Sequence, residues 1–290
     1  MPDHQRTLQN VVSCVGDLPA LPSVVAEVMK ITDDPAAAMS HICECIQRDP
    51  ALTAKILKIS NSPYYGMKQY VGTLKLALVI LGVREVRNIV LGVSVFESLC
   101  DKGVDSILRQ DFWDHSVRVA ALSKMLGGAL SLGFQGEDFI SGLLHDVGKM
   151  VLLNQLGPAY RQIFRKTGGN GDKLALAELE TFGFDHADAA AALSLHWNLP
   201  QTLTDTVGLH HKVADRVIGK AKDPKLAAIV RISNMAVRED FSTPDVPCSS
   251  CLDDEAWELL TAKAPKDYAG RHALVCGFVG KLAEVPALTL

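Results

Sequence analysis

Residues 139–149 read Phe-Ile-Ser-Gly-Leu-Leu-His-Asp-Val-Gly-Lys, and this stretch is the most informative about the fold of the chain. Its first six residues are apolar or small, which is typical of a buried helix. His145 and Asp146 follow directly, and burying an imidazole beside a carboxylate is costly unless something binds both groups. A divalent metal ion is well suited to do so. The stretch therefore predicts a buried helix that leads into a candidate metal site.

Further helices are predicted on the N-terminal side of this stretch. Residues 73–81 and 84–99 are almost continuously apolar and are separated by Gly82, which indicates two helices that are covered on most sides. Asp49-Pro50 has the order of a capping residue followed by a proline, which is typical of a helix start. The buried stripe of that helix would consist of Leu52, Ile56 and Ile59. No alternation with a period of two is long enough for a strand, so we predict an all-α fold.

The length and composition allow one large or two smaller helical domains. The chain has 290 residues, of which 48% are hydrophobic and 21% are charged, as in an ordinary globular protein. A proline-containing break at 242–247 separates a short C-terminal piece. We expect an N-terminal helical subdomain over residues 14–110, a second helical subdomain over 111–241, and a helical extension over 248–290.

Charge and cysteine usage narrow the classes of partner and compartment. The net charge of −4 gives no general attraction to nucleic acid or anionic lipid, and no basic run is present, so we do not expect a nucleic-acid partner. The longest charge-free apolar runs, 76–83 and 88–96, are less than half of the ~20 residues that span a bilayer. Residues 1–6 are polar and not typical of a secretory signal. Seven cysteines without framework spacing favour a reducing, cytoplasmic location.

Six of the nine histidines fall between positions 115 and 211, most of them on or beside predicted apolar helices. A single histidine of this kind is more often a hydrogen-bonded core residue than a ligand. Several on successive helices, together with an aspartate, can instead converge at the centre of a bundle, where metal sites are built. Lys149 lies one helical turn after His145 and could reach a phosphate or pair with an acid. The six histidines are His115, His145, His186, His196, His210 and His211, of which we interpret His196 as structural.

The chain also resembles a known family. His115, followed some thirty residues later by His145-Asp146, resembles the start of the metal-ligand pattern of the HD-superfamily phosphohydrolases. Closer still is the resemblance to the HDOD domain, which covers about residues 14–215. The segments that carry it are Leu18-Pro19-Ala20-Leu21-Pro22, Arg48-Asp49-Pro50-Ala51-Leu52, Ile59-Ser60-Asn61-Ser62-Pro63, the stretch from Leu81 to Asn88, His196-Trp197-Asn198-Leu199-Pro200 and His210-His211. The resemblance implies an N-terminal helical subdomain packed on an HD-like one, and a bacterial signalling role without demonstrated catalysis.

The resemblance also implies site residues. His115, His145 and Asp146 match the first three HD ligand positions. His186, His210 and His211 match further ligand positions of the HD-GYP cyclic-dinucleotide phosphodiesterases, and Lys149 matches their motif lysine. The departure lies at the last ligand position, where order and spacing place Asn234 instead of an aspartate. The Gly-Tyr-Pro loop motif is also absent, because Lys212-Val213-Ala214 follows the histidine pair.

Two functions remain as alternatives. We favour a regulatory HDOD module that acts through a signalling protein partner, without catalysis and with a divalent metal ion (iron, manganese, magnesium or zinc) or a small ligand at its centre. The alternative is a metal-dependent phosphohydrolase that acts on a nucleotide or cyclic dinucleotide. An asparagine brings a dipole where an aspartate brings a full charge, so Asn234 favours the first interpretation. No membrane association is expected from either.

Overall fold

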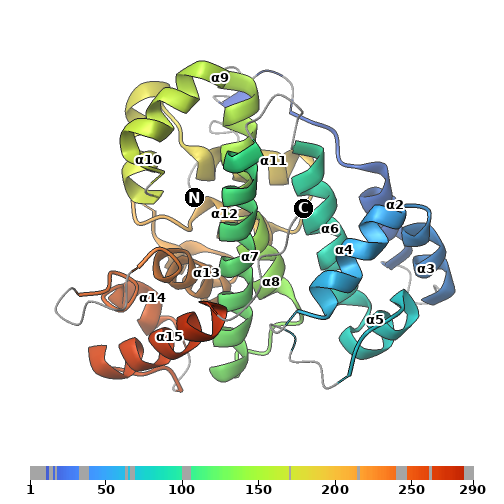
Figure 1. Cartoon of the computed structure of the whole chain (residues 1–290). Helices are drawn as coiled ribbons and strands as arrows, with labels where there is room; N and C mark the ends of the chain where they lie inside the picture. The colour runs from blue at the N-terminus through green and yellow to red at the C-terminus, as the bar shows by residue number, and fades with distance from the viewer. Residues whose placement is uncertain are drawn as a thin grey trace.

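The structure is a computed structural model that describes residues 11–12, 16, 18–32, 39–62, 65, 69–99, 106–169, 171–213, 216–239, 247–260 and 263–283. Every regular element in these ranges is a helix, so the all-α prediction is confirmed. In Figure 1 the N-terminal helices, blue to teal, lie to the right of the long central helix α7, and the last helices, orange to red, lie to its lower left. No helix in the described ranges is long and apolar enough to cross a membrane.

The N-terminal helices are α2 (Ser23–Thr32), α3 (Met39–Gln47), α4 (Pro50–Ser60), α5 (Leu74–Leu81) and α6 (Val83–Leu99). The predicted start of α4 is confirmed, because the Asp49 side chain accepts a hydrogen bond from the Leu52 amide at 3.0 Å. The stripe Leu52, Ile56 and Ile59 is buried as expected. The break between α5 and α6 lies at Gly82, whose φ of 87° favours glycine.

One expectation about these helices is wrong. Helix α6 is covered on most sides, with buried residues along almost its whole length. Helix α5 is not, because Val79 is 62% exposed and Ile80 is 36% exposed. Apolar composition alone cannot distinguish the two cases, because α5 packs against α3, α4 and α6 from one side only and leaves a hydrophobic face uncovered.

The central helices are α7 (Ser106–Ala129), α8 (Glu137–Leu144), α9 (Val147–Thr167), α10 (Gly171–Phe182), α11 (His186–His196), α12 (Gln201–Gly208) and α13 (Pro224–Ala236). Helix α7 packs against α8 and α13, and α9 packs against α11. Glycines permit two of these close approaches. A Cβ at position 142 would lie 2.6 Å from the Ala120 Cα, and one at position 148 would lie 1.8 Å from the His186 carbonyl oxygen. The spacing of α7, α8, α9 and α11 therefore depends on Gly142 and Gly148.

The last helices, α14 (Asp254–Glu258) and α15 (Tyr268–Ala283), complete a second apolar core that includes residues of α7 and α13. The first core runs from the N-terminal helices through α8, α9 and α11. The polar centre described next lies on helices of both cores. The proposed division of the chain at 14–110, 111–241 and 248–290 stays a prediction.

Candidate metal centre

Asp146 lies in the turn between α8 and α9 and is 4% exposed. Its neighbour His145 is completely buried, and the His145 Nδ1 donates a hydrogen bond to the Gly142 carbonyl oxygen at 2.7 Å. This bond makes Nδ1 the donor, so that Nε2 carries the lone pair in the neutral ring. That Nε2 lies 3.2 Å from Asp146 Oδ2. The turn thus points two possible ligand atoms into the interior.

The Oδ2 oxygen of Asp146 also faces α7 and α13. His115, on α7, has its Nε2 at 3.4 Å from Oδ2. The Asn234 Oδ1, on α13, lies 3.1 Å from the same His115 Nε2. His115, His145 and Asp146 offer ligand atoms that lie within 4.8 Å of one another. We call these three residues the outer half-site, and Asp146 contributes its Oδ2 to it. The name reflects the partial exposure of one member, since the His115 side chain is 14% exposed.

The other carboxylate oxygen, Oδ1, faces three more histidines. His186 begins α11 and has its Nε2 at 3.3 Å from Oδ1, and the His210 Nε2 lies at 3.4 Å. The His211 Nε2 is 2.7 Å from the His186 Nε2. Asp146 and these histidines also offer ligand atoms within 4.8 Å of one another, and all four residues are buried. We call this set the inner half-site; the two half-sites share the Asp146 carboxylate.

Each histidine of the inner half-site is held by an oxygen on its Nδ1 side. Nδ1 of His186 contacts Glu178 at 2.6 Å, Nδ1 of His210 contacts the Val207 carbonyl at 2.6 Å, and Nδ1 of His211 contacts Asp172 at 2.7 Å. Such partners orient ligand histidines and raise their basicity. In the neutral rings, the three Nε2 atoms then present lone pairs to the interior.

Several buried polar atoms at this centre have no hydrogen-bond partner. Among the described residues these include Nε2 of His145, Nε2 of His210 and Oδ1 of Asp146, and all three are acceptors when the two rings are neutral. The two Nε2 atoms of His186 and His211, at 2.7 Å, are also both acceptors when their rings are neutral, so a proton or a cation must lie between them. Buried acceptors left unpaired are costly. The arrangement fits a bound metal ion.

The pKa shifts of His115, His210 and Asp146 agree with this interpretation, whereas that of His186 does not. Burial, with the Arg238 charge, lowers the pKa of His115 well below its usual value, and burial lowers the pKa of His210 to about 3. Burial alone would raise the pKa of Asp146, but its interactions with His145 and Lys149 hold it well below the usual range. Neutral imidazoles and an ionised carboxylate are the forms that bind metal. Burial opposes protonation of His186 as well, but the Glu178 carboxylate raises the pKa of His186.

Two cationic side chains lie against the Oδ2 oxygen. The Lys149 Nζ donates to Asp146 Oδ2 at 2.5 Å, and Lys149 is 1% exposed. Burial and the Arg238 charge lower the pKa of Lys149 to about 8, although Asp146 opposes the shift. The Arg238 Nη2 lies 3.3 Å from the same oxygen and 3.1 Å from the His115 Nε2. Arg238 was not expected from the sequence, although it lies four residues after Asn234.

The structure thus brings together all eight residues singled out in the sequence. Their role as ligands stays a prediction. Sequence reasoning missed Arg238 and the supporting carboxylates Glu178 and Asp172. A signal existed for Asp172, which in the sequence directly follows a stretch with three glycines, Gly168, Gly169 and Gly171. None existed for Glu178, which lies in the middle of α10 like any amphipathic helix residue.

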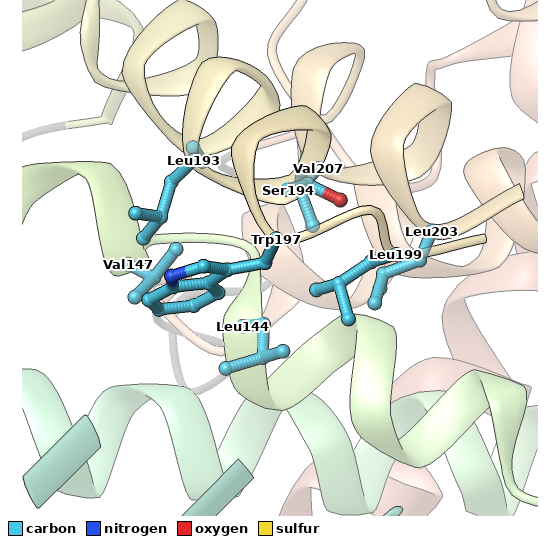
Figure 2. A pocket seen from close by; sticks show the side chains of 9 residues that line it. Leu144, Val147, Leu193, Ser194, Trp197, Leu199, Leu203 and Val207 are labelled. Atoms are coloured by element: carbon cyan, nitrogen blue, oxygen red, sulfur yellow. The ribbon is translucent and has the colours of Figure 1, made fainter. Parts of the chain in front are cut away.

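A small cavity lies beside the centre, between α11, α12 and the turn that carries His145 and Asp146 (Figure 2). Its volume, as space for the centre of a water-sized sphere, is about 10 Å³. Trp197 lies among aliphatic side chains that include Leu144, Val147 and Leu193, and the one hydroxyl group, that of Ser194, already pairs with Thr204 at 2.7 Å. Such a cavity is at the lower limit for a single water molecule and is too small for a nucleotide.

Comparison with known proteins gives a family and a fold. The sequence profile of the HDOD domain matches residues 18–213. A Treponema pallidum (strain Nichols) protein described as uncharacterized is 28% identical over 246 residues, which are 81% of this chain and 45% of that protein. The chain therefore spans less than half of the length of that curated relative.

Solved structures share the fold at low identity. A crystal structure of an HDOD domain protein of unknown function from Geobacter sulfurreducens has a TM-score of 0.76 at 21% identity, and the match covers 99% of this chain and 100% of that one. A Shewanella amazonensis SB2B protein described as a candidate phosphohydrolase has a TM-score of 0.68 at 23% identity, over 95% of this chain and 93% of that one. At such identities the likeness concerns the fold alone.

Proposed function

Because this chain belongs to the HDOD domain family, we propose that it is a regulatory signalling module whose buried centre binds a divalent metal ion without turning over a substrate. The burial of the candidate ligands is the observation that carries this proposal. His145, His186, His210 and His211 are at most 1% exposed. A hydrolytic metal site keeps an open coordination position where bound water meets the substrate. We infer that a phosphodiester does not reach an ion held by these four histidines.

Asn234 supports the same conclusion. Its amide lies beside His115, where a hydrolytic centre of the HD type would place an aspartate. Two unit charges ~4 Å apart interact by roughly 4 kcal/mol at an effective dielectric constant near 20, and the amide forgoes that attraction to a cation. Less charge around the ion leaves the binding weaker, since each 1.4 kcal/mol is about tenfold in affinity.

The donor set suggests which metals the centre would take. The inner half-site combines three imidazoles with one carboxylate. Imidazole suits zinc and iron, whereas magnesium and calcium prefer sites made of oxygen ligands only. We therefore expect zinc or iron rather than magnesium. When bound, such an ion would tie α8, α11 and the segment after α12 to one another, and would stabilise the arrangement of helices that a partner protein meets.

The compartment and partner follow from the same proposal. The described cysteines, namely Cys43, Cys45, Cys248, Cys251 and Cys276, are free thiols, which supports a reducing, cytoplasmic location. The partner would be a signalling protein.

A metal-dependent phosphohydrolase acting on a nucleotide or cyclic dinucleotide is the second candidate. The complete set of histidines and Asp146 favours it, because a shared carboxylate is suited to two ions that act together. Lys149 argues against it. In the HD-type reading this lysine contacts phosphate, but its Nζ is held by Asp146 Oδ2 at 2.5 Å and is buried.

Metal analysis of the protein purified without added metal tests the binding proposal. We expect bound zinc or iron in amounts comparable to the protein, and a loss of at least tenfold in His186→Ala. His196→Ala is the matched control, because His196 is an exposed histidine at the end of the same helix. Metal present at less than a tenth of the protein, or lost equally in both variants, would contradict the proposal.

A further inference from the structure

The two half-sites differ in what already occupies them. Both cationic side chains of the centre contact Asp146 Oδ2, the oxygen of the outer half-site: Lys149 at 2.5 Å and Arg238 at 3.3 Å. The other oxygen, Oδ1, has no hydrogen-bond partner among the described residues. The two cationic side chains therefore lie on the outer side of the carboxylate, and Oδ1 on the inner side faces imidazole rings.

Arg238 contacts two of the three atoms that an ion in the outer half-site would use. Its Nη2 lies 3.1 Å from the His115 Nε2 and 3.3 Å from Asp146 Oδ2, and those two atoms are 3.4 Å apart. A metal ion would bind both atoms at about 2.0–2.2 Å. When the His115 Nε2 carries its lone pair, the guanidinium hydrogen bonds and the metal bonds need the same lone pairs, so one cation excludes the other.

The guanidinium is also held from its outer side. Arg238 Nη1 donates to the Gly169 carbonyl oxygen at 3.0 Å, in the turn that follows α9. That turn is fixed by the bond from the Gly169 amide to the Phe164 carbonyl at 3.1 Å. Arg238 thus bridges the end of α13, the turn after α9 and the outer half-site, and only 27% of its side chain is exposed. A planar group with fixed donors loses little entropy on such bonds.

Asn234 is also consistent with an outer half-site that is occupied by the Arg238 guanidinium. It lies one helical turn before Arg238 and contacts the His115 Nε2 that Arg238 also contacts. An aspartate here would add a negative charge for a second metal ion. The chain instead has a neutral amide together with a fixed positive side chain, so the outer half-site carries its own cation.

The ligand histidines of the inner half-site are instead supported by oxygen atoms. Its histidines are supported by the carboxylates Glu178 and Asp172 and by the Val207 carbonyl, which increase the negative potential around the three Nε2 atoms. We propose that the Arg238 guanidinium permanently takes the place of a metal ion in the outer half-site, so that the centre binds one divalent ion, in the inner half-site, and not two. This rests on the proposed function, namely that the centre binds metal at all.

The test is the metal stoichiometry of the full chain after saturation with Co²⁺ and removal of free metal, measured by elemental analysis. We expect one ion per chain in the wild type, in Arg238→Lys and in Asn234→Asp, since each keeps a cation at position 238. The double variant Arg238→Ala with Asn234→Asp should bind two. Arg48→Ala is the matched control, because Arg48 is an exposed arginine paired with a carboxylate, Glu27, at 2.9 Å; it should stay at one.

A second readout separates one ion from two independently of the amount bound. Two Mn²⁺ ions bridged by Asp146 would lie about 3.5–4 Å apart and be magnetically coupled, whereas a single ion gives an uncoupled paramagnetic resonance signal. Two ions in the wild type or in Asn234→Asp, or one ion in a double variant whose circular dichroism is native, would overturn the inference. No ion in the wild type would instead contradict the proposed function. The two failures are therefore distinguishable.

Discussion

Replacing Gly148 by alanine should separate α9 from α11 and damage the centre. An added Cβ would lie 1.8 Å from the His186 carbonyl oxygen and 2.7 Å from the Ala190 amide nitrogen, whereas ordinary contact begins at 3.4 Å. Both neighbours are backbone atoms, so no side-chain rotation relieves the clash. The two helices must separate by more than 1 Å in a close-packed core. His186, which begins α11, would then be displaced relative to the turn that carries Asp146.

Overpacking of this kind costs about 1–3 kcal/mol and occasionally more, and a backbone clash belongs at the upper end. We therefore expect Gly148→Ala to lower the free energy of unfolding by about 3 kcal/mol in urea denaturation, and to lower metal affinity at the same time. Gly128→Ala is the matched control. This glycine lies in α7 with nothing within 4 Å of an added Cβ, so alanine should raise stability by about 0.5–1 kcal/mol. A loss below about 1 kcal/mol in Gly148→Ala, with metal retained, would refute the reasoning.

Three further perturbations test other parts of the structure. Asp49→Ala removes the side-chain cap of α4 and should cost about 1 kcal/mol in urea denaturation, with metal content unchanged; no loss would mean that the cap is replaced by water. Glu178→Gln should weaken metal affinity about 10–100-fold, because the hydrogen bond that orients His186 is weakened. Glu180→Gln, on the exposed face of the same helix, should leave the affinity unchanged. Equal affinities of the two variants in a competition assay would contradict the supporting role of Glu178. Burial raises the pKa of Cys251 from its usual 9.0 to about 11. The unfolded chain therefore loses this proton first, so stability should fall as pH rises from 9 to 11, and the fall should be shallower in Cys251→Ala; identical pH profiles would rule out that contribution.

Much of the fold was predictable because its signals are local. The start of α4 follows from Asp49-Pro50, and the break between α5 and α6 follows from Gly82, since capping and backbone conformation depend on adjacent residues. The exposure of Val79 and Ile80 was not predictable. Which face of an apolar helix stays uncovered depends on where the other helices pack, and periodicity within α5 does not contain that information.

The residues of the metal centre were likewise predictable only in part. His145-Asp146 and the histidines around it could be singled out because their residue types are unusual beside apolar helices. Arg238 could not, because an arginine at the end of a helix is ordinary and its contact with His115 joins residues far apart in the sequence. The contact between Arg238 and the outer half-site depends on how α7 and α13 pack against each other, which local sequence signals do not specify.

The most direct test of the central claim is the turnover of a phosphodiester by the metal-loaded chain. Bis(p-nitrophenyl) phosphate is a suitable probe, measured against the free metal ion and against His145→Ala. The buried ligands and the fixed Arg238 predict hydrolysis no faster than with free metal, and no difference between wild type and His145→Ala. Hydrolysis that is faster with the wild type and is abolished in His145→Ala would contradict a non-catalytic module and establish a phosphohydrolase.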